Sequence, residues 1–410
     1  MSEWKKVKLG ELYEVHNGLS KGRQFFGSGY PFLTFSNVFN NWFLPEELES
    51  LVQSSEKERQ TCSIKKGDVF ITRTSETMDE LGMSSVALKD YPNATYNGFT
   101  KRLRPLTDEV IPEYIGYYLR SPKFRGKFMA FSTMTTRASL ANDDLLSMEV
   151  DIPEKAIQQR IATILSRYDS LIENYQKQIK LLEESAQRLY KEWFIDLRFP
   201  GHENTKIVDG VPEGWEKKKL NEIFTFVRGK SYTSKEISND GVLMVNLKNI
   251  QAFGGYKRNA EKRFIGSYKQ EQTLKKGDLI MGVTDMTQER RLVGHVALIP
   301  DFKEPATFSM DLIKILSYEI PNSFLYCTMR FGGISSKISP LANGVNVLHL
   351  KPEAMMGLEM VTPSINIINK FSKIVDGFFN NILILQSQIR LLTEARDRLL
   401  PKLMSGEIEV

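Results

Sequence analysis

The sequence predicts an α/β (α+β) chain of two similar domains with mixed sheets, each followed by a long helix, in an internal pseudo-two-fold repeat. Residues 63–71 read SIKKGDVFI, and the stretch from 273 to 281 reads TLKKGDLIM, a shift of 210 positions. Other landmarks keep nearly the same shift, and each copy ends in a long heptad pattern of apolar residues. At 410 residues, the chain is also too long for one typical hydrophobic core.

Composition places the chain among soluble globular proteins, with 41% hydrophobic and 26% charged residues. The 55 basic and 50 acidic side chains leave a net charge of +5, which is compatible with a nucleic-acid partner. Cys62 and Cys327 occupy unmatched positions, which argues against a disulfide framework. The N-terminus lacks an apolar leader, and no stretch has the eighteen apolar residues of a membrane helix, so we expect a cytoplasmic protein.

The repeat sets the predicted domain boundaries. Trp4 returns as Trp215, the tripeptide VAL at 86–88 returns at 296–298, and Pro153 returns as Pro363. We therefore predict a first domain over 1–153, a central spacer helix over 154–198, a second domain over 199–363 and a C-terminal spacer helix over 364–410.

Both predicted helices carry apolar residues at the a and d positions of about five heptads. The predicted seam consists of Ile157, Ile161, Ile164, Leu171, Leu182 and Leu189 in the first helix, and Ile367, Phe371, Ile374, Leu385, Leu392 and Leu399 in the second. Two such helices bury their seams most economically against each other, as an antiparallel coiled-coil spacer. The alternative is that each helix packs independently on a local core.

No catalytic motif is legible. Phe25, Gly27 and Gly29 spell the F-x-G-x-G of a methyl-donor loop, but Pro31 follows, so the loop cannot lead into a helix N-terminus. The chain has no Asn-Pro-Pro-Tyr or Asp-Pro-Pro-Tyr tetrapeptide and no G-x-x-x-x-G-K-[ST] phosphate loop. The four histidines show no metal spacing, so we predict a non-catalytic chain without a metal site of its own; they are His16, His202, His295 and His349.

Four stretches, taken together, resemble the specificity subunit of type I restriction-modification systems. They are VPEGWEKKKLNEIF at 211–224, KKGDVFITRTSETMDELGMSSVAL at 65–88, SLANDDLLSMEVDIPEKAIQQRIATIL at 139–165 and LLTEARDRLLPKLMSGEIEV at 391–410. The resemblance spans essentially the whole chain.

This resemblance implies two target recognition domains that each read one half of a split site in double-stranded DNA. It also implies that the two helices space the halves and dock methyltransferase subunits, two per chain, and that restriction/translocase subunits can join. S-adenosylmethionine, ATP and Mg would belong to those partner subunits, and none to this chain. The second copy differs from the first at two places. Val283 occupies the position that corresponds to Arg73, and the second copy reads INKF at 368–371 where the first reads QQRI at 158–161.

Candidate DNA contacts are basic, amide and hydroxyl side chains in glycine-rich or polar loops, since cations neutralise phosphates and a few side chains read base edges. In the first domain they are Lys21, Arg23, Arg73, Thr74 and Arg137, and in the second Arg228, Lys230, Arg290, Arg291 and Asn346. The competing hypothesis is a coiled-coil protein-interaction scaffold without sequence-specific DNA binding. A steep loss of DNA affinity with salt would favour the specificity subunit over the scaffold.

Overall fold

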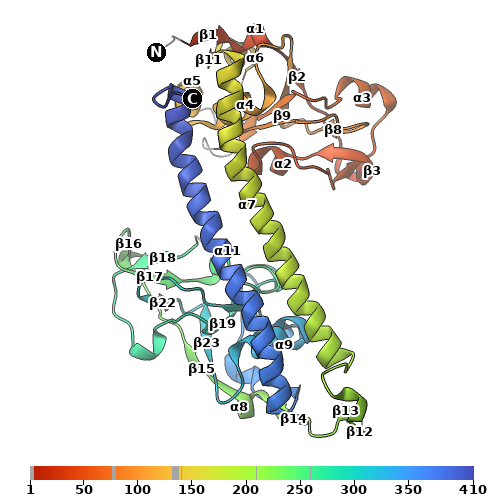
Figure 1. The fold of residues 1–410 in the computed structure, drawn as a ribbon, viewed down its shortest axis with the longest axis vertical. Coiled ribbons are helices and arrows are strands. Elements are labelled where there is room, and N and C mark those ends of the chain that lie inside the picture. The colour runs from red at the N-terminus through yellow and green to blue at the C-terminus, as the bar shows by residue number, and fades with distance from the viewer. Residues whose placement is uncertain (1–3, 76–79, 132–137, 140, 209, 259) are drawn as a thin grey trace. The chain divides into compact units, whose positions relative to one another are not determined.

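The computed structural model describes residues 4–75, 80–131, 138–139, 141–208, 210–258 and 260–410 (Figure 1). It contains two compact units, unit 1 (Met1–Asn174 with Ile389–Val410) and unit 2 (Tyr175–Gln388). The predicted α/β class is confirmed. The compact units divide the chain within both long helices, whereas the predicted domain boundaries at 153, 198 and 363 fall near helix ends and stay a prediction.

The main sheet of each unit is four-stranded and antiparallel, and its strand order is the same in both. In unit 1 the order is β2 (Tyr13–Asn17), β9 (Thr100–Pro105), β5 (Val69–Thr72) and β7 (Ser84–Val86). In unit 2 it is β15 (Phe224–Arg228), β23 (Leu312–Ser317), β19 (Leu279–Gly282) and β21 (Val296–Leu298).

A second sheet in each unit contains one parallel strand pair, which makes the architecture mixed. In unit 1 it is β4 (Leu51–Val52), β3 (Phe26–Leu33) and β8 (Thr95–Tyr96), and in unit 2 it is β16 (Ile237–Ser238), β18 (Lys262–Phe264), β17 (Val242–Val245) and β22 (Ala306–Phe308). The two-stranded pairs are β1 (Lys5–Lys8) with β11 (Glu149–Ile152), β14 (Glu216–Lys219) with β25 (Glu359–Thr362), β6 (Thr74–Ser75) with β10 (Ala138–Ser139), β20 (Thr284–Asp285) with β24 (Leu348–His349), and β12 (Ile207–Val208) with β13 (Val211–Pro212).

Short helices connect these strands, and one long helix follows each domain. The α-helices are α1 (Leu9–Leu12), α2 (Phe35–Asn40), α3 (Glu56–Thr61), α4 (Pro112–Arg120), α5 (Pro122–Phe131), α6 (Asn142–Ser147), α7 (Lys155–Tyr190), α8 (Leu220–Ile223), α9 (Asn322–Phe331), α10 (Ile334–Ile338) and α11 (Ile365–Ser405). A π-helical turn, η3 (Lys191–Ile195), continues α7. The 3₁₀ turns are η1 (Arg23–Phe25), η4 (His202–Asn204), η5 (Ser234–Glu236), η6 (Leu247–Asn249), η7 (Gln270–Gln272), η8 (Ser339–Leu341) and η9 (Pro352–Met355). Within the described ranges, no helix is long and apolar enough to span a bilayer.

The repeated Lys-Lys-Gly-Asp encodes the same turn in both units. The Asp68 carboxylate accepts a hydrogen bond from the Lys65 backbone N–H at 2.7 Å, and Asp278 accepts one from Lys275 at 2.8 Å. The glycine that precedes each aspartate, Gly67 in unit 1 and Gly277 in unit 2, has φ +88° and +84° respectively, a region that favours glycine over residues with a side chain. The repeated motif therefore forms the turn that precedes β5 in unit 1 and β19 in unit 2.

The VAL landmark is not a structural equivalence. Ile71 pairs with Ser84, whereas Met281 pairs with Val296, so 13 positions separate the partners in unit 1 and 15 in unit 2. A connection that is two residues longer shifts the strand that follows it from an offset of 210 to one of 212. The VAL at 296–298 thus occupies the place of residues 84–86.

The core of each unit includes the beginning of one long helix and the end of the other. In unit 1, Ile161 and Leu165 of α7 share a cluster with Leu400 and Leu403 of α11. In unit 2, Phe371 of α11 shares one with Ala186 and Tyr190 of α7.

Polar contacts accompany this packing. In unit 1, Arg396 of α11 pairs with Asp169 of α7 at 2.6 Å, and the Tyr117 hydroxyl of α4 donates to the same carboxylate. In unit 2, Arg330 of α9 pairs with Glu183 of α7 at 3.4 Å. Each domain is thereby tied to a helix by charge as well as by apolar contact.

Burial along the helices differs from the predicted seam at two positions. Leu171 and Ile374 are 45% and 41% exposed, while their neighbours Ile172 and Val375 are 9% and 0% exposed. A straight α-helix drifts by about 20° per heptad against a strict seven-residue repeat. The face that meets the domain core therefore moves by one residue, and the assignment of a helix–helix seam stays a prediction.

Gly229→Ala should destabilise the chain, because a Cβ at Gly229 would lie 2.0 Å from the Ser309 carbonyl oxygen. Overpacking of this kind costs about 1–3 kcal/mol. The matched control is Gly377→Ala in α11, where a Cβ meets nothing within 4 Å. That change should stabilise the helix by about 0.5–1 kcal/mol. Urea unfolding followed by circular dichroism measures both, and a stabilised Gly229→Ala variant would contradict the close approach.

Candidate nucleic-acid interface

Two β-ribbons continue from the main sheets, and several of the predicted DNA contacts lie in them or beside them. Ribbon 1 pairs β6 with β10, in the register Thr74↔Ser139, and ribbon 2 pairs β20 with β24, in the register Thr284↔His349. The positions correspond across the repeat at an offset of 210. Two-stranded ribbons are one of the elements that fit the major groove of B-DNA.

Arg73 lies immediately before ribbon 1, and its guanidinium makes a long hydrogen bond. Its Nη1 donates to Asn17 Oδ1 at 3.3 Å, and its backbone N–H donates to the Phe99 carbonyl at 2.9 Å. Burial and the nearby Arg73 charge lower the pKa of Lys101, on the adjacent strand β9. Thr74 is in β6, and Arg137 lies outside the described residues.

The glycine-rich stretch of unit 1 presents one engaged cation and one exposed cation. The Lys21 ammonium lies 2.9 Å from Glu58 Oε2 and 5.0 Å from the Phe25 ring centroid. This hydrogen bond from Lys21 is the main cause that lowers the pKa of Glu58. Arg23, two residues later in η1, is exposed. Phosphate contact by Lys21 would have to compete with its ion pair, whereas Arg23 is accessible.

The corresponding stretch of unit 2 is also partly engaged. Arg228 Nη2 donates to both carboxylate oxygens of Glu353, at 2.7 and 2.8 Å, although the pair is solvent-exposed. Lys230 is half-buried, and its backbone bonds to Phe308 and Met310. Exposed pairs contribute little to stability, so Arg228 can exchange Glu353 for a phosphate at low cost.

The loop that follows β20 carries Arg290 and Arg291. Arg291 pairs with Glu289, and Arg290 adopts φ +52°, which only a few per cent of non-glycine residues do. The Arg290 Nε is buried, and no described group accepts a hydrogen bond from it. Asn346 is exposed in the turn that precedes β24. Gln288 Nε2 donates to the Val345 carbonyl at 2.9 Å, which joins this turn to the loop.

Asp285 organises that loop and was missed by sequence reasoning. Its buried carboxylate accepts hydrogen bonds from the backbone N–H of Thr287 at 2.8 Å, of Leu292 at 2.6 Å and of Val293 at 3.2 Å, and from the Thr287 hydroxyl at 2.8 Å. Burial opposes ionisation of Asp285, but these bonds outweigh it and lower its pKa. An aspartate often accepts a hydrogen bond from the backbone two residues later in a turn, so the sequence Asp285-Met-Thr287 could have predicted a turn here.

His295 is buried beside β21, and its Nδ1 has no hydrogen-bond partner among the described residues. Burial lowers its pKa, and its ring packs edge-on against Phe253 at 5.5 Å. Among the described residues, no group of three or more His, Cys, Asp or Glu side chains lies where it could hold a metal ion.

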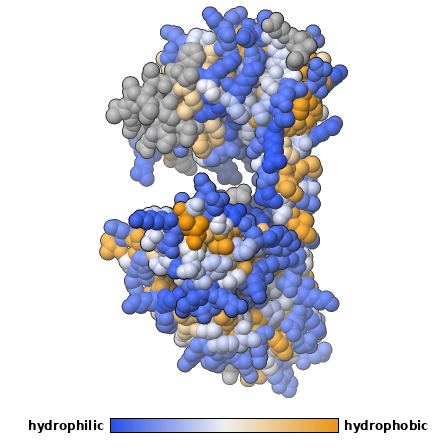
Figure 2. Space-filling view, turned by 90° about the vertical axis from the view of Figure 1, so that its left-hand side faces the viewer, coloured by the Kyte–Doolittle hydropathy of each residue, from blue (hydrophilic) through white to orange (hydrophobic). Residues whose placement is uncertain are grey.

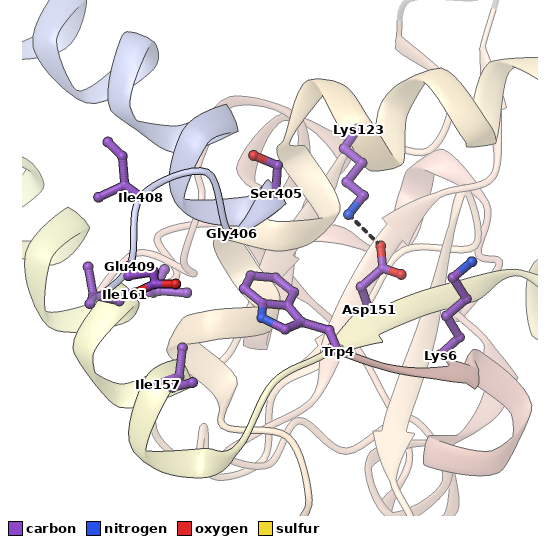
Figure 3. A pocket seen from close by; sticks show the side chains of 11 residues that line it. Trp4, Lys6, Lys123, Asp151, Ile157, Ile161, Ser405, Gly406, Ile408 and Glu409 are labelled. Atoms are coloured by element: carbon purple, nitrogen blue, oxygen red, sulfur yellow. Dashed lines mark ion pairs between the residues drawn. The ribbon is translucent and has the colours of Figure 1, made fainter. Parts of the chain in front are cut away.

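A cavity of about 470 Å³ lies in unit 1, between β1, β11, α7 and the C-terminal tail (Figure 3). Trp4 and Asp151 line it, and Lys123 pairs with Asp151 at 2.9 Å. Burial acts against ionisation of Asp151, yet hydrogen bonds from Lys123 and Tyr118 lower its pKa. A cavity of about 350 Å³ in unit 2 is lined by the repeat partners Trp215 and Lys217. None of the predicted DNA contacts lines either cavity.

The surface visible in Figure 2 is mostly hydrophilic, with hydrophobic residues exposed in small groups. Two of the most exposed large apolar side chains lie beside ribbon 2: Met286, directly after β20, is 77% exposed, and Val345, three residues before β24, is 86% exposed. The Gln288–Val345 hydrogen bond joins the loop of Met286 to the turn of Val345, so both side chains lie on the segments that carry Arg290, Arg291 and Asn346.

Comparison with known proteins identifies the family. A model of the type I restriction modification DNA specificity domain matches residues 1–184 and again 212–394. The chain is 28% identical over 422 residues to the specificity subunit of the type I restriction enzyme MjaIX from Methanocaldococcus jannaschii, covering 100% of this chain and 94% of that one. It is 24% identical over 478 residues to the HindI specificity subunit from Haemophilus influenzae, covering 100% of both.

The fold is also similar to a solved structure. The type I restriction-modification S subunit from M. genitalium superposes with a TM-score of 0.58 at 17% identity, covering 98% of this chain and 96% of the other. At this identity the similarity concerns the fold alone.

Asp285→Asn should destabilise the chain at neutral pH by about 1.5–3 kcal/mol, because an amide cannot accept all the bonds that the carboxylate accepts. A depressed folded-state pKa contributes stability that is present above the ordinary value of 3.8 and is lost as pH falls through the lower folded-state pKa. The difference in stability between wild type and variant should therefore shrink below about pH 4. Urea unfolding at several pH values measures it, with the exposed Asp240→Asn as control; a difference that does not change with pH would contradict the assignment.

Proposed function

Because the chain belongs to the DNA specificity subunits of type I restriction-modification systems, we propose that its two recognition domains each read one half of a bipartite, interrupted DNA site. The chain is the non-catalytic recognition component of such a complex. One observation carries the proposal: the two units present β-ribbons at equivalent positions, but with different side chains. Arg73 precedes ribbon 1, whereas the apolar Val283 precedes ribbon 2.

The two long helices act as the spacer between the half-sites and as the docking surface for methyltransferase subunits, two per chain. Their exposed apolar residues support docking, since a helix that served only as a spacer would not need them. These residues are Leu171, Leu181, Ile365, Ile374, Ile384 and Leu391, each at least 41% exposed. Leu181 and Leu391 are 210 positions apart, as two equivalent docking sites require.

The chemistry of the complex is assigned to the partners. S-adenosylmethionine would be held by the methyltransferase subunits, and ATP with Mg²⁺ by restriction/translocase subunits where these join. The chain would work in the cytoplasm, where its DNA is.

Methylation-sensitive sequencing of cells that carry the complete system tests the proposal. The wild-type chain should give one asymmetric, interrupted motif. Arg73→Ala should relax the bases of the first half-site only, at a cost of about 1–3 kcal/mol, if the guanidinium pairs with a guanine. Arg188→Ala is the matched control, because Arg188 is an exposed arginine of α7 and should leave the motif unchanged. Equal loss of affinity across all sequences would make Arg73 a phosphate contact, and the absence of any motif would contradict the proposed function.

Lengthening both helices should widen the gap between the half-sites without changing the bases read. Seven residues inserted after Asn174 and seven after Gln388 enter the helices where the chain passes from one compact unit to the other. Each insertion keeps the heptad phase and adds about 10 Å of helix, or about three base pairs. The same sequencing measures the gap. A motif with changed bases and an unchanged gap would show that the helices do not set the spacing.

A further inference from the structure

The turn that carries Asn346 is a tightly closed hairpin. Asn343 and His349 exchange both backbone hydrogen bonds, at 3.0 and 2.9 Å. Gly344 has φ +151°, and a Cβ there would lie 1.9 Å from the Val347 carbonyl oxygen. The glycine allows the chain to reverse within a few residues, which leaves Val345 and Asn346 exposed at the tip.

The tip and the neighbouring loop are fixed by several bonds. The Gln288 side chain donates to the Val345 carbonyl, ribbon 2 pairs Asp285 with Leu348, and the Asp285 carboxylate anchors the loop from Thr287 to Val293. Met286 follows directly after β20 in this frame. Val345 and Met286 are the two most exposed large apolar residues in the described part of the chain. Contact of these two side chains with a partner would remove apolar surface from water, which is favourable.

The chemistry of the tip matches one base pair. In the major groove, an A·T pair presents the adenine N7 acceptor and N6 donor together with the thymine O4 and C5-methyl group. Asparagine pairs with the adenine edge through its amide, and an apolar side chain contacts the thymine methyl. Asn346 and Val345 provide these two kinds of group on adjacent residues, with Arg290 and Arg291 on the joined loop to favour DNA over an uncharged partner.

We propose that the hairpin Asn343–His349 reads an A·T pair in the second half-site, with Asn346 on the adenine edge and Val345, supported by Met286, on the thymine methyl. This inference rests on the proposed function and adds the identity of a base pair to it. On this proposal the thymine C5-methyl group is recognised directly, whereas a contact made by charge alone would not distinguish thymine from deoxyuridine.

The test uses the full chain in complex with its methyltransferase subunit, on duplexes that carry the site determined by sequencing. Each thymine of the second half-site is replaced in turn by deoxyuridine, which removes only the C5-methyl group. At one position, Kd should rise about three- to fivefold, the effect of losing one buried methyl group. Val345→Ala should weaken binding to the thymine duplex and abolish the difference between thymine and deoxyuridine.

Val208→Ala is the matched control, because Val208 is 57% exposed in the same unit but lies in β12, outside ribbon 2. It should retain the full difference. The inference is overturned by a second half-site without an A·T pair, by equal affinity for every deoxyuridine duplex, or by a Val345→Ala variant that keeps the wild-type ratio. It is also overturned if Val345→Ala leaves DNA binding intact and releases the methyltransferase subunit in sedimentation. Failure of the proposed function is distinguishable, because the unmodified duplex would then show no preference over unrelated DNA.

Discussion

Burial of both long helices in both domain cores is the constraint on which the rest of the structure depends. Neither unit closes its core with its own helix alone: unit 1 uses Leu165 of α7 and Leu403 of α11, and unit 2 uses Phe371 of α11 and Tyr190 of α7. A fully buried side chain of this kind stabilises by about 1.5–3 kcal/mol. Each recognition domain therefore depends on both helices, and a change that shifts one helix is felt in two cores.

The repeat could be predicted because its elements are local. A Lys-Lys-Gly-Asp turn needs only its own four residues, and the heptad stripe needs only one helix. The register of the strand after the turn could not be predicted in the same way, because it depends on the length of the loop between two paired strands. The VAL tripeptides matched by sequence, but the longer connection in unit 2 places them two positions apart.

The candidate site follows the same division. Loops beside glycine could be recognised as basic and polar, and the structure places Arg73, Thr74 and Asn346 on or next to the ribbons. The partners of the other cations could not be recognised. Arg228 meets Glu353 from 125 positions away, and such pairs arise only when distant strands and turns converge. Asp285 was missed because the candidate loops were selected for basic and polar side chains that could contact DNA. The role of this carboxylate becomes visible only when its four hydrogen-bond donors are brought together by the fold.

The two units share a frame of equivalent polar contacts. Arg102 in β9 and Lys314 in β23 are equivalent buried cations, and each donates to the backbone carbonyl of an equivalent residue, Ser63 or Thr273, both at 2.8 Å. The Asp68 and Asp278 turns add a second equivalent pair of contacts, so the residues that precede β5 and β19 are held in the same way in both units. Ribbon 2 continues from β19 in this frame, and the residues Val345 and Asn346 of its turn are exposed. Under the proposed function, substitutions at Val345 and Asn346 would change the bases that are read while the sheet, the helices and their shared cores stay as they are.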